Sequence, residues 1–186
     1  AQRPVQSILI EGLKRLEYRG YDSAGLATLN DHHIERTRAQ GKVAELEALL
    51  TDSSAHQGIA HTRWATHGIP SVRNAHPHQS GRFAVVHNGI IENSTILKKF
   101  LEGKGHVFKS QTDTEVIVHL ISEHLKTKNI LNSITTALKQ LHGSYALGIL
   151  FKDEPDLIIG ARRGSPLAVG YGPNENYLGS DSYALK

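Results

Sequence analysis

The sequence predicts an α+β layered sandwich, in which helices cover sheets that pack on each other. Strand-like runs dominate the first half of the chain, three helical runs follow, and strand-like runs return after Gly143. The runs after Gly143 recur about every 8–12 residues between turn clusters, which is typical of antiparallel sheet. With 186 residues, the chain fits one domain that is large enough to bury its own core.

The first half of the chain alternates between helices and strands. Apolar residues at helical spacing predict an amphipathic helix over 5–17, which Gly20 ends. Runs of small and β-branched residues predict strands at 23–29 and 34–38, separated by the polar turn 30–32. By the same criteria we expect a short helix at 43–50 and strands at 57–63 and 82–87.

The second half begins with three predicted helices, at 94–103, 114–126 and 130–141, and the last carries a clear apolar stripe. Four strands then follow between turn clusters rich in proline, glycine, aspartate and asparagine. They are expected at 145–151, 156–161, 167–171 and 176–180.

The composition excludes several function classes. The net charge is only +3, and basic and acidic residues alternate along the chain, which argues against a nucleic-acid partner. No apolar run approaches the roughly 20 residues of a membrane helix, so we expect no membrane partner. The chain contains no cysteine, which agrees with the reducing cytoplasm where we expect the protein to act. We expect no cofactor.

The segment His61-Thr-Arg-Trp-Ala-Thr-His-Gly68, at the end of a predicted strand, indicates recognition of a small carboxylate. Arg63 offers a planar fork of donors that matches a carboxylate two bonds at a time. A single arginine is more often a surface ion-pair residue. Its place at a strand end, beside Trp64 and Thr66, favours the binding role.

Two further segments extend this ligand to an amino acid. Asp113 can hold an ammonium group, although Thr112-Asp-Thr-Glu115 also has the form of a capping box for the following helix. The side chain of Asn88 and the backbone N–H of Gly89 can act as paired donors to a developing oxyanion. Asn-Gly is also a common hairpin turn, but the residues after Gly89 are expected to run into a helix instead of a second strand.

Twelve histidines raise the possibility of a metal site, since several of them lie between residues 61 and 87. The spacing at Asn74-Ala-His-Pro-His78 lacks a nearby carboxylate and does not fit a zinc site, so we expect no metal. The alternative for His76 and His87 is that they are buried scaffold residues held by hydrogen bonds.

Six motifs in order give the chain a specific resemblance, which covers essentially all of it. They lie at 13–25, 61–68, 74–78, 87–93, 112–115 and 164–167. The chain resembles the glutaminase domains (glutamine amidotransferase type 2) of the glucosamine-6-phosphate synthase family, the isomerising glutamine–fructose-6-phosphate aminotransferases. The resemblance implies a four-layer αββα sandwich of two mainly antiparallel sheets, of the N-terminal-nucleophile hydrolase type. It also implies hydrolysis of L-glutamine to glutamate and ammonia, which passes to fructose 6-phosphate to give glucosamine 6-phosphate.

The resemblance also implies roles for individual residues. Arg63 would hold the carboxylate of glutamine, Asp113 its ammonium, and Asn88 and Gly89 would form the oxyanion hole. Thr66 and His67 would lie in a mobile loop over the substrate. Arg19 would lie near the nucleophile, Trp64 at the entrance of the site, and His76 in the same pocket with weaker support.

The chain departs from the family at its two ends. It lacks methionine and the family's opening strand with the nucleophilic cysteine, so we expect a segment of about 5–8 residues upstream of Ala1. The sugar isomerase domains, which would bind fructose 6-phosphate, are not in the chain either. Residues 1–186 would therefore be a glutaminase domain that is inactive alone, part of an enzyme expected to form a homo-oligomer. Three alternatives stay open: a non-catalytic glutamine sensor, the glutaminase domain of another type 2 amidotransferase, and a histidine-metal hydrolase.

Overall fold

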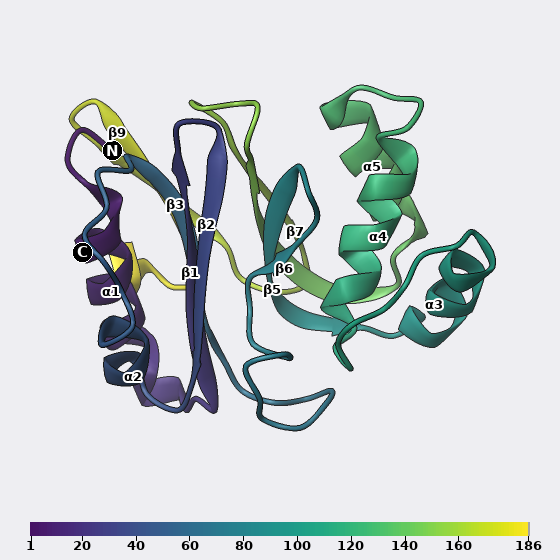
Figure 1. Cartoon of the computed structure of the whole chain (residues 1–186), viewed down its shortest axis with the longest axis horizontal. Coiled ribbons are helices and arrows are strands. Elements are labelled where there is room, and N and C mark those ends of the chain that lie inside the picture. Colours follow the sequence, from purple (N-terminus) through teal and green to yellow (C-terminus); the bar gives the residue numbers. More distant parts are fainter. Residues whose placement is uncertain (186) are drawn as a thin grey trace.

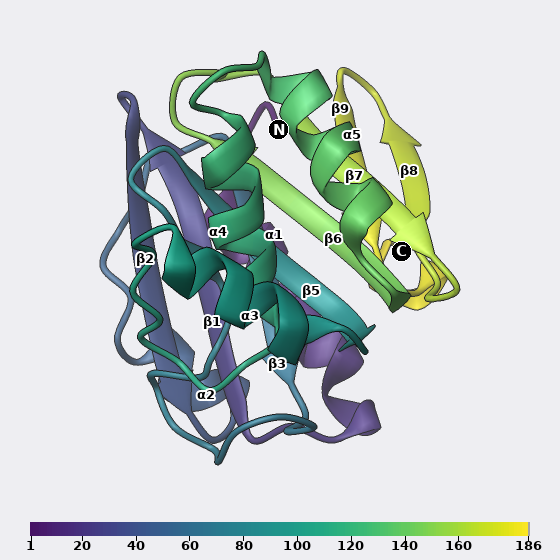
Figure 2. The ribbon, with the colours of Figure 1, turned by 90° about the vertical axis from the view of Figure 1, so that its right-hand side faces the viewer.

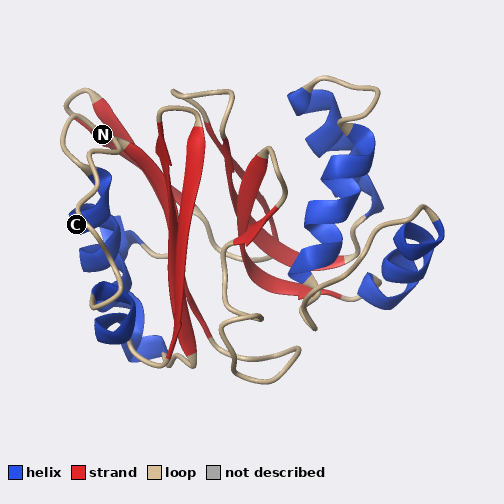
Figure 3. Ribbon diagram, viewed as in Figure 1, coloured by secondary structure: helices blue, strands red, loops and turns tan. Residues whose placement is uncertain are grey.

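The computed structural model describes residues 1–185 and consists of four layers (Figure 1). Helices α1 (Val5–Leu16) and α2 (Val43–Glu47) form one outer layer, followed by a sheet that contains β1 to β3. The second sheet contains β4 to β7 and is covered by helices α3 (Ser94–Gly103), α4 (Thr114–His124) and α5 (Ile130–Gln140). Figure 3 shows the helices outside and the strands inside. The predicted α+β class and the four-layer order are confirmed.

The first sheet has the order β2-β1-β3, with all pairs antiparallel. Strand β1 (Ser23–Asn30) is central and almost entirely buried, while β2 (His33–Gln40) and β3 (Gln57–Arg63) lie at its sides. The β1–β2 turn has Asp31 and His32 in the left-handed region, with φ of 44° and 63°. Asparagine, aspartate and histidine tolerate this region better than other residues with side chains, so these residues fit the turn predicted at 30–32.

The second sheet has the order β4-β5-β6-β7, again antiparallel. Its strands are β4 (His78–Gln79), β5 (Phe83–Ile91), β6 (Gly143–Phe151) and β7 (Ile158–Arg163). The largest apolar cluster of the chain lies between this sheet and helices α3 to α5. Its fully buried side chains include Phe83, Leu120, Ile121, Leu147 and Phe151.

Strands β8 (Ala168–Gly172) and β9 (Glu175–Gly179) form a separate hairpin near β7 (Figure 2). At Gly160 of β7, a Cβ would lie 3.1 Å from a methyl carbon of Leu178 and 3.3 Å from one of Leu167, so the missing side chain allows this close packing. Two short 3-10 helices, η1 (Glu17–Arg19) and η2 (Ser182–Leu185), follow α1 and the hairpin.

One predicted strand boundary that bears on function differs in the structure. The strand predicted to end at 87 continues as β5 to Ile91, so Asn88 and Gly89 lie within a strand and pair with Ala146 and Tyr145 of β6. The expectation that the residues after Gly89 leave the sheet was wrong, because pairing with β6 extends the strand by four residues. Strand β4 was not predicted, and the other boundaries differ by a few residues.

The apolar contact between the two sheets is small. It comprises Ala27, Leu29, Ile59, Ala84 and Leu150 as its buried members. The rest of the space between β3, β5 and the β8–β9 hairpin is a cavity. Among the described residues, no helix is long and apolar enough to cross a membrane.

Candidate functional site

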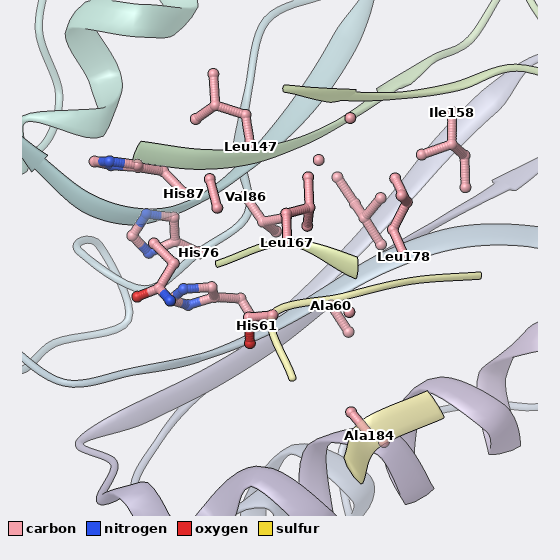
Figure 4. A pocket seen from close by; sticks show the side chains of 18 of the residues that line it. Ala60, His61, His76, Val86, His87, Leu147, Ile158, Leu167, Leu178 and Ala184 are labelled. Carbon is pink, nitrogen blue, oxygen red and sulfur yellow. The ribbon is translucent and has the colours of Figure 1, made fainter. Parts of the chain in front are cut away.

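The cavity between the two sheets has a volume of about 1290 Å³. Strands β3 and β5, the loop after β3, the first turn of α4 and the β8–β9 hairpin all contribute to its wall. Figure 4 shows that its two ends differ: His61, His76 and His87 gather at one end, Ile158 and Leu178 lie at the other, and Leu167 lies between them. The cavity therefore has a polar end, near residues 88–89, and an apolar end.

All nine residues predicted for the site line this one cavity. They are Arg19, Arg63, Trp64, Thr66, His67, His76, Asn88, Gly89 and Asp113. They come from η1, β3, the loop after β3, β5 and the start of α4, so segments up to 94 residues apart meet here (113 − 19 = 94).

Arg63, the last residue of β3, is buried and bonds to its own chain. Its Nη1 lies 3.4 Å from Oδ1 of Asp22, and its Nη2 donates to the carbonyl oxygens of His67 and Gly68, at 2.9 Å for Gly68. The alternative of a surface ion pair was wrong in its position, because Arg63 is buried and its carboxylate partner Asp22 is nearly so. A guanidinium can present two parallel N–H groups to a carboxylate along either of two edges, Nε with Nη2 or Nη1 with Nη2. Both edges use Nη2, so the carbonyl oxygens of the loop already occupy part of each edge.

The loop after β3 places Trp64, Thr66 and His67 at the surface of the cavity, where all three are exposed. The ring of Trp64 lies over Gly20, whose Cβ would come within 2.6 Å of it, so a residue with a side chain at position 20 would displace the ring. The far end of the loop is fixed by Asn74, which exchanges side-chain hydrogen bonds with the backbone N–H and side chain of Gln111.

Arg19 lies at the rim and is joined to the C-terminal part of the chain. Its guanidinium donates to Oγ of Ser180 at 3.1 Å and forms an ion pair with Asp181. It therefore links η1, which precedes Gly20 and Trp64, to the turn that follows β9.

Asn88 and Gly89 lie in β5 at the polar end of the cavity. Asn88 is exposed to the cavity, and Gly89 has a φ of 138°, a conformation that side chains rarely adopt. A Cβ at Gly89 would lie 2.1 Å from the backbone oxygen of Ser144. Position 89 therefore requires glycine for two independent reasons.

Substitution of Gly89 by alanine should destabilise the fold by about 3 kcal/mol or more, because neither the φ angle nor the clash with Ser144 can be relieved cheaply. Urea denaturation followed by circular dichroism measures the effect. Gly103→Ala is the matched control: nothing lies within 4 Å of a Cβ there and the residue ends α3, so alanine should be neutral or slightly stabilising. Equal stability of the two variants would contradict the expectation.

Asp113 precedes α4 and makes no capping hydrogen bond with its side chain. Its Oδ2 accepts the backbone N–H of Ile91 at 2.7 Å, which ties the start of α4 to the end of β5. Oδ1 has no hydrogen-bond partner among the described residues and can accept from a ligand. The capping-box alternative was wrong, because Glu115 instead accepts from the backbone N–H groups of Lys109 and Ser110, at 2.7 and 2.6 Å.

The histidines at the polar end form a buried cluster held by threonines. Thr114 Oγ1 lies 2.8 Å from Nε2 of His76 and 2.9 Å from Nδ1 of His87, and Thr112 Oγ1 lies 3.0 Å from Nε2 of His78. The scaffold interpretation of His76 and His87 thus holds, although both also line the cavity. No group of three or more histidine, aspartate or glutamate side chains in residues 1–185 could hold a metal ion.

Burial keeps these rings neutral. Desolvation lowers the pKa of His61 to about 3, with His87 and Arg63 adding to the effect, and lowers the pKa of His76 well below its ordinary value. For His78, desolvation and the nearby Arg38 lower the pKa to about 3. The pKa of His87 is also lowered by desolvation. Neutral rings can both donate and accept, and they add no positive charge to the cavity.

Sequence reasoning missed Asp22 and Thr114. Asp22 lies just before β1 and faces Arg63, and its Oδ2 is buried without a hydrogen-bond partner. Thr114 was considered only as a helix start. A sequence signal existed for neither contact, because the partners of these residues lie 27 to 41 positions away along the chain.

Comparison with known proteins shows the family of the chain. A family model described as a glutamine amidotransferase domain matches residues 61–186. The chain is 56% identical to a glutamine–fructose-6-phosphate aminotransferase (isomerizing) of Zymomonas mobilis, over 95% of the chain and 30% of the relative. It is 55% identical to the protein of that name in Pseudomonas putida, over 100% and 31%. The chain thus spans about a third of the length of these curated relatives.

Solved structures give the same result. The glutamine phosphoribosylpyrophosphate amidotransferase of B. subtilis superposes with a TM-score of 0.87 at 27% identity, covering 100% of this chain and 41% of that one. A structure described as the allosteric regulatory enzyme of purine biosynthesis superposes with a TM-score of 0.85 at 28% identity, covering 96% and 40%. The α+β sandwich is therefore that of N-terminal-nucleophile amidotransferases, and the chain belongs to the glutamine amidotransferase family.

Proposed function

We propose that this chain is the glutaminase part of a glutamine–fructose-6-phosphate aminotransferase, which hydrolyses L-glutamine and passes ammonia to fructose 6-phosphate. One observation carries the proposal: nine residues predicted from the sequence, in segments far apart along the chain, line a single cavity. The identity of about 55% to aminotransferases of that name favours this member over the phosphoribosylpyrophosphate amidotransferases, at 27%.

Glutamine would lie at the polar end of the cavity. Its ammonium bonds Oδ1 of Asp113, and its carboxylate bonds Arg63. Because His67 and Gly68 occupy Nη2 of Arg63, a carboxylate that binds two bonds at a time displaces at least one of these carbonyls. Substrate binding and the position of the 64–68 loop are therefore linked.

A nucleophile carried on a further strand would fit along β3. The edge of β3 away from β1 is unpaired among residues 1–185, since the sheet order is β2-β1-β3, and the nitrogen of Ala1 donates to the oxygen of His56 at 2.6 Å, just before β3 begins. A strand that runs antiparallel to β3 into Ala1 places its seventh residue upstream opposite Arg63 (56 + 7 = 63). A cysteine at the start of such a strand reaches the polar end of the cavity.

The reaction follows from this placement. The terminal amine takes the thiol proton, and the sulfur bonds the amide carbon of glutamine while the carbonyl electrons move to oxygen, which faces Asn88 and Gly89 N–H. The C–N bond then breaks, the amine passes the proton to the leaving nitrogen, and ammonia departs from a γ-glutamyl thioester. Water cleaves the thioester to glutamate and restores the thiol.

The test uses the full-length protein. We expect intact mass measurement to find an amino-terminal cysteine, an electrophilic glutamine analogue to label it, and glutamine to yield equal amounts of glutamate and ammonia when no sugar phosphate is present. A full-length protein that binds glutamine but is neither labelled nor active would contradict the proposal and support the sensor alternative. One mole of zinc per chain with metal-dependent hydrolysis would support the metal alternative instead.

Substitution of Arg63 by lysine in the full-length protein should raise the KM for glutamine at least about tenfold, because a point charge replaces a planar fork. Lysine also cannot reach Asp22 and the loop carbonyls together, so the loop loses an anchor. Steady-state glutaminase kinetics measure the effect, and Arg82→Lys is the control, since Arg82 forms an exposed ion pair with Asp153 outside the cavity. An unchanged KM would remove Arg63 from the carboxylate role.

Other expectations from the sequence stay predictions. These are the inactivity of residues 1–186 alone, the attached isomerase domains with their sugar-phosphate site, the homo-oligomeric state and the cytoplasmic location. Gel filtration of the full-length protein tests the homo-oligomeric state. An assay of the isolated chain for glutamate release tests whether residues 1–186 are inactive alone.

A further inference from the structure

The two residues proposed to stabilise the oxyanion are anchored on both sides by one turn of helix. After Gly89, the backbone N–H of Ile91 donates to Oδ2 of Asp113 at 2.7 Å. Before Asn88, Nδ1 of His87 lies 2.9 Å from the hydroxyl of Thr114. Residues 87 and 91 of β5 are thus bonded to consecutive residues at the start of α4, and the oxyanion residues lie between the two anchors.

The hydroxyl of Thr114 also bonds His76, at 2.8 Å from Nε2, and Thr114 itself is fully buried. A hydroxyl has one proton and two lone pairs, so with two neutral rings it either donates to one ring nitrogen and accepts from the other, or accepts from both. At least one of the two ring nitrogens that face the hydroxyl must therefore carry a proton. Among residues 1–185, the remaining ring nitrogens, Nδ1 of His76 and Nε2 of His87, are buried and have no side-chain hydrogen-bond partner.

We propose that Thr114 is a positioning residue for glutamine hydrolysis, whose hydroxyl holds Asn88 and Gly89 in place through His87. The inference rests on the proposed function. Thr114 lies in the wall of the cavity but has no exposed surface, and both ring contacts of its hydroxyl are to histidines, so its route to the reaction is the ring of His87 and the strand that carries it. The start of α4 would then supply both a substrate ligand, Asp113, and the support of the oxyanion hole.

The hydroxyl matters here more than the volume of the side chain. Valine fills the same space but bonds neither ring, so His76 and His87 would each lose their only side-chain hydrogen bond. The ring of His87 could then turn, and the strand beside it could shift. Displacements of about 1 Å in a catalytic arrangement can lower rates by up to about 10²-fold. Because oxyanion donors act in the transition state, the loss falls on kcat and not on KM.

The experiment compares Thr114→Val and Thr114→Ser in the full-length protein, with Ser133→Ala as a control that removes another fully buried, bonded hydroxyl, in α5. We expect valine to lower kcat about tenfold or more with a KM for glutamine within about threefold of the wild type. Serine keeps the hydroxyl and should restore kcat to near the wild-type value. The control should show a stability loss with normal kcat.

Two kinetic results would overturn the inference: a kcat of Thr114→Val within twofold of the wild type, or a Thr114→Ser variant as slow as Thr114→Val. Imidazole ¹⁵N NMR of the wild-type protein provides a test that needs no variant to fold. Of the two nitrogens facing Thr114, Nε2 of His76 and Nδ1 of His87, at least one should carry a proton. Two unprotonated nitrogens would exclude the bridge, because a single hydroxyl proton cannot bond both. A wild-type protein without glutaminase activity would instead refute the proposed function, and the NMR result would still decide the bridge.

Discussion

Replacing Asn88 by alanine should lower the glutaminase kcat of the full-length protein by about 10²–10³-fold, the usual loss for one oxyanion donor. The side chain is exposed to the cavity and makes no hydrogen bond to the described residues, so its removal leaves the sheet intact. Because the charge on oxygen develops only in the transition state, the KM for glutamine should change little. Steady-state kinetics and a thermal unfolding curve of the same preparation measure both parts.

Asn88→Asp sharpens this test. Aspartate has nearly the same shape as asparagine but replaces the donor by a negative charge, so its kcat should be at least as low as that of the alanine variant. Near-normal turnover in either variant, with an unchanged melting temperature, would remove Asn88 from the oxyanion hole. Gly89 would then be the sole donor of the two.

Lowering the pH from 7 to 5 should reduce the free energy of unfolding by at least about 4 kcal/mol, because buried histidines stay neutral in the fold and take up protons on unfolding. The pKa values of His61 and His78 are lowered to about 3, and that of His76 is also far below its ordinary value, because burial penalises the charged ring. An unfolded histidine has a pKa of about 6.5, so His61 and His78 each contribute about 2 kcal/mol over this range, and His76 adds in the same direction.

The sign follows from proton uptake. Between pH 6.5 and about 3 the unfolded chain binds more protons than the fold, so stability rises with pH in that window. Glu115, whose pKa is lowered to about 2, acts at lower pH: its contribution is complete above the ordinary carboxyl pKa and is lost as pH falls toward 2. The change in the free energy of unfolding between pH 7 and pH 5 therefore comes mainly from the histidines.

Urea denaturation of the chain at several pH values measures this slope. His78→Gln should reduce this slope by the amount that corresponds to about one proton taken up on unfolding, since glutamine can still bond Thr112 but does not titrate. His33→Gln removes an exposed ring from β2 and serves as the control. A free energy of unfolding that is the same at pH 7 and pH 5 would show that the cluster is already protonated or hydrated in the fold.

Much of the fold could be predicted locally. Helices α3, α4 and α5 follow from apolar spacing, and the β1–β2 hairpin follows from a turn whose residues tolerate the left-handed region. The end of β5 could not be predicted, because residues 88–91 are held in the strand by pairing with β6, more than 50 residues later. Periodicity reports the local face of an element, but sheet pairing is a contact between distant parts of the chain.

The sequence by itself determined which residues to expect at the site, because the chemistry of a guanidinium, a carboxylate and an Asn-Gly pair can be identified one residue at a time, and the nine expected residues line one cavity. Only the tertiary structure decided how these groups are held. It joined Arg63 to Asp22 and the loop carbonyls, and it brought the start of α4 against β5 through Asp113 and Thr114. The reason is that buried polar groups must find partners, and which partners are within reach depends on how the two sheets and their helices pack.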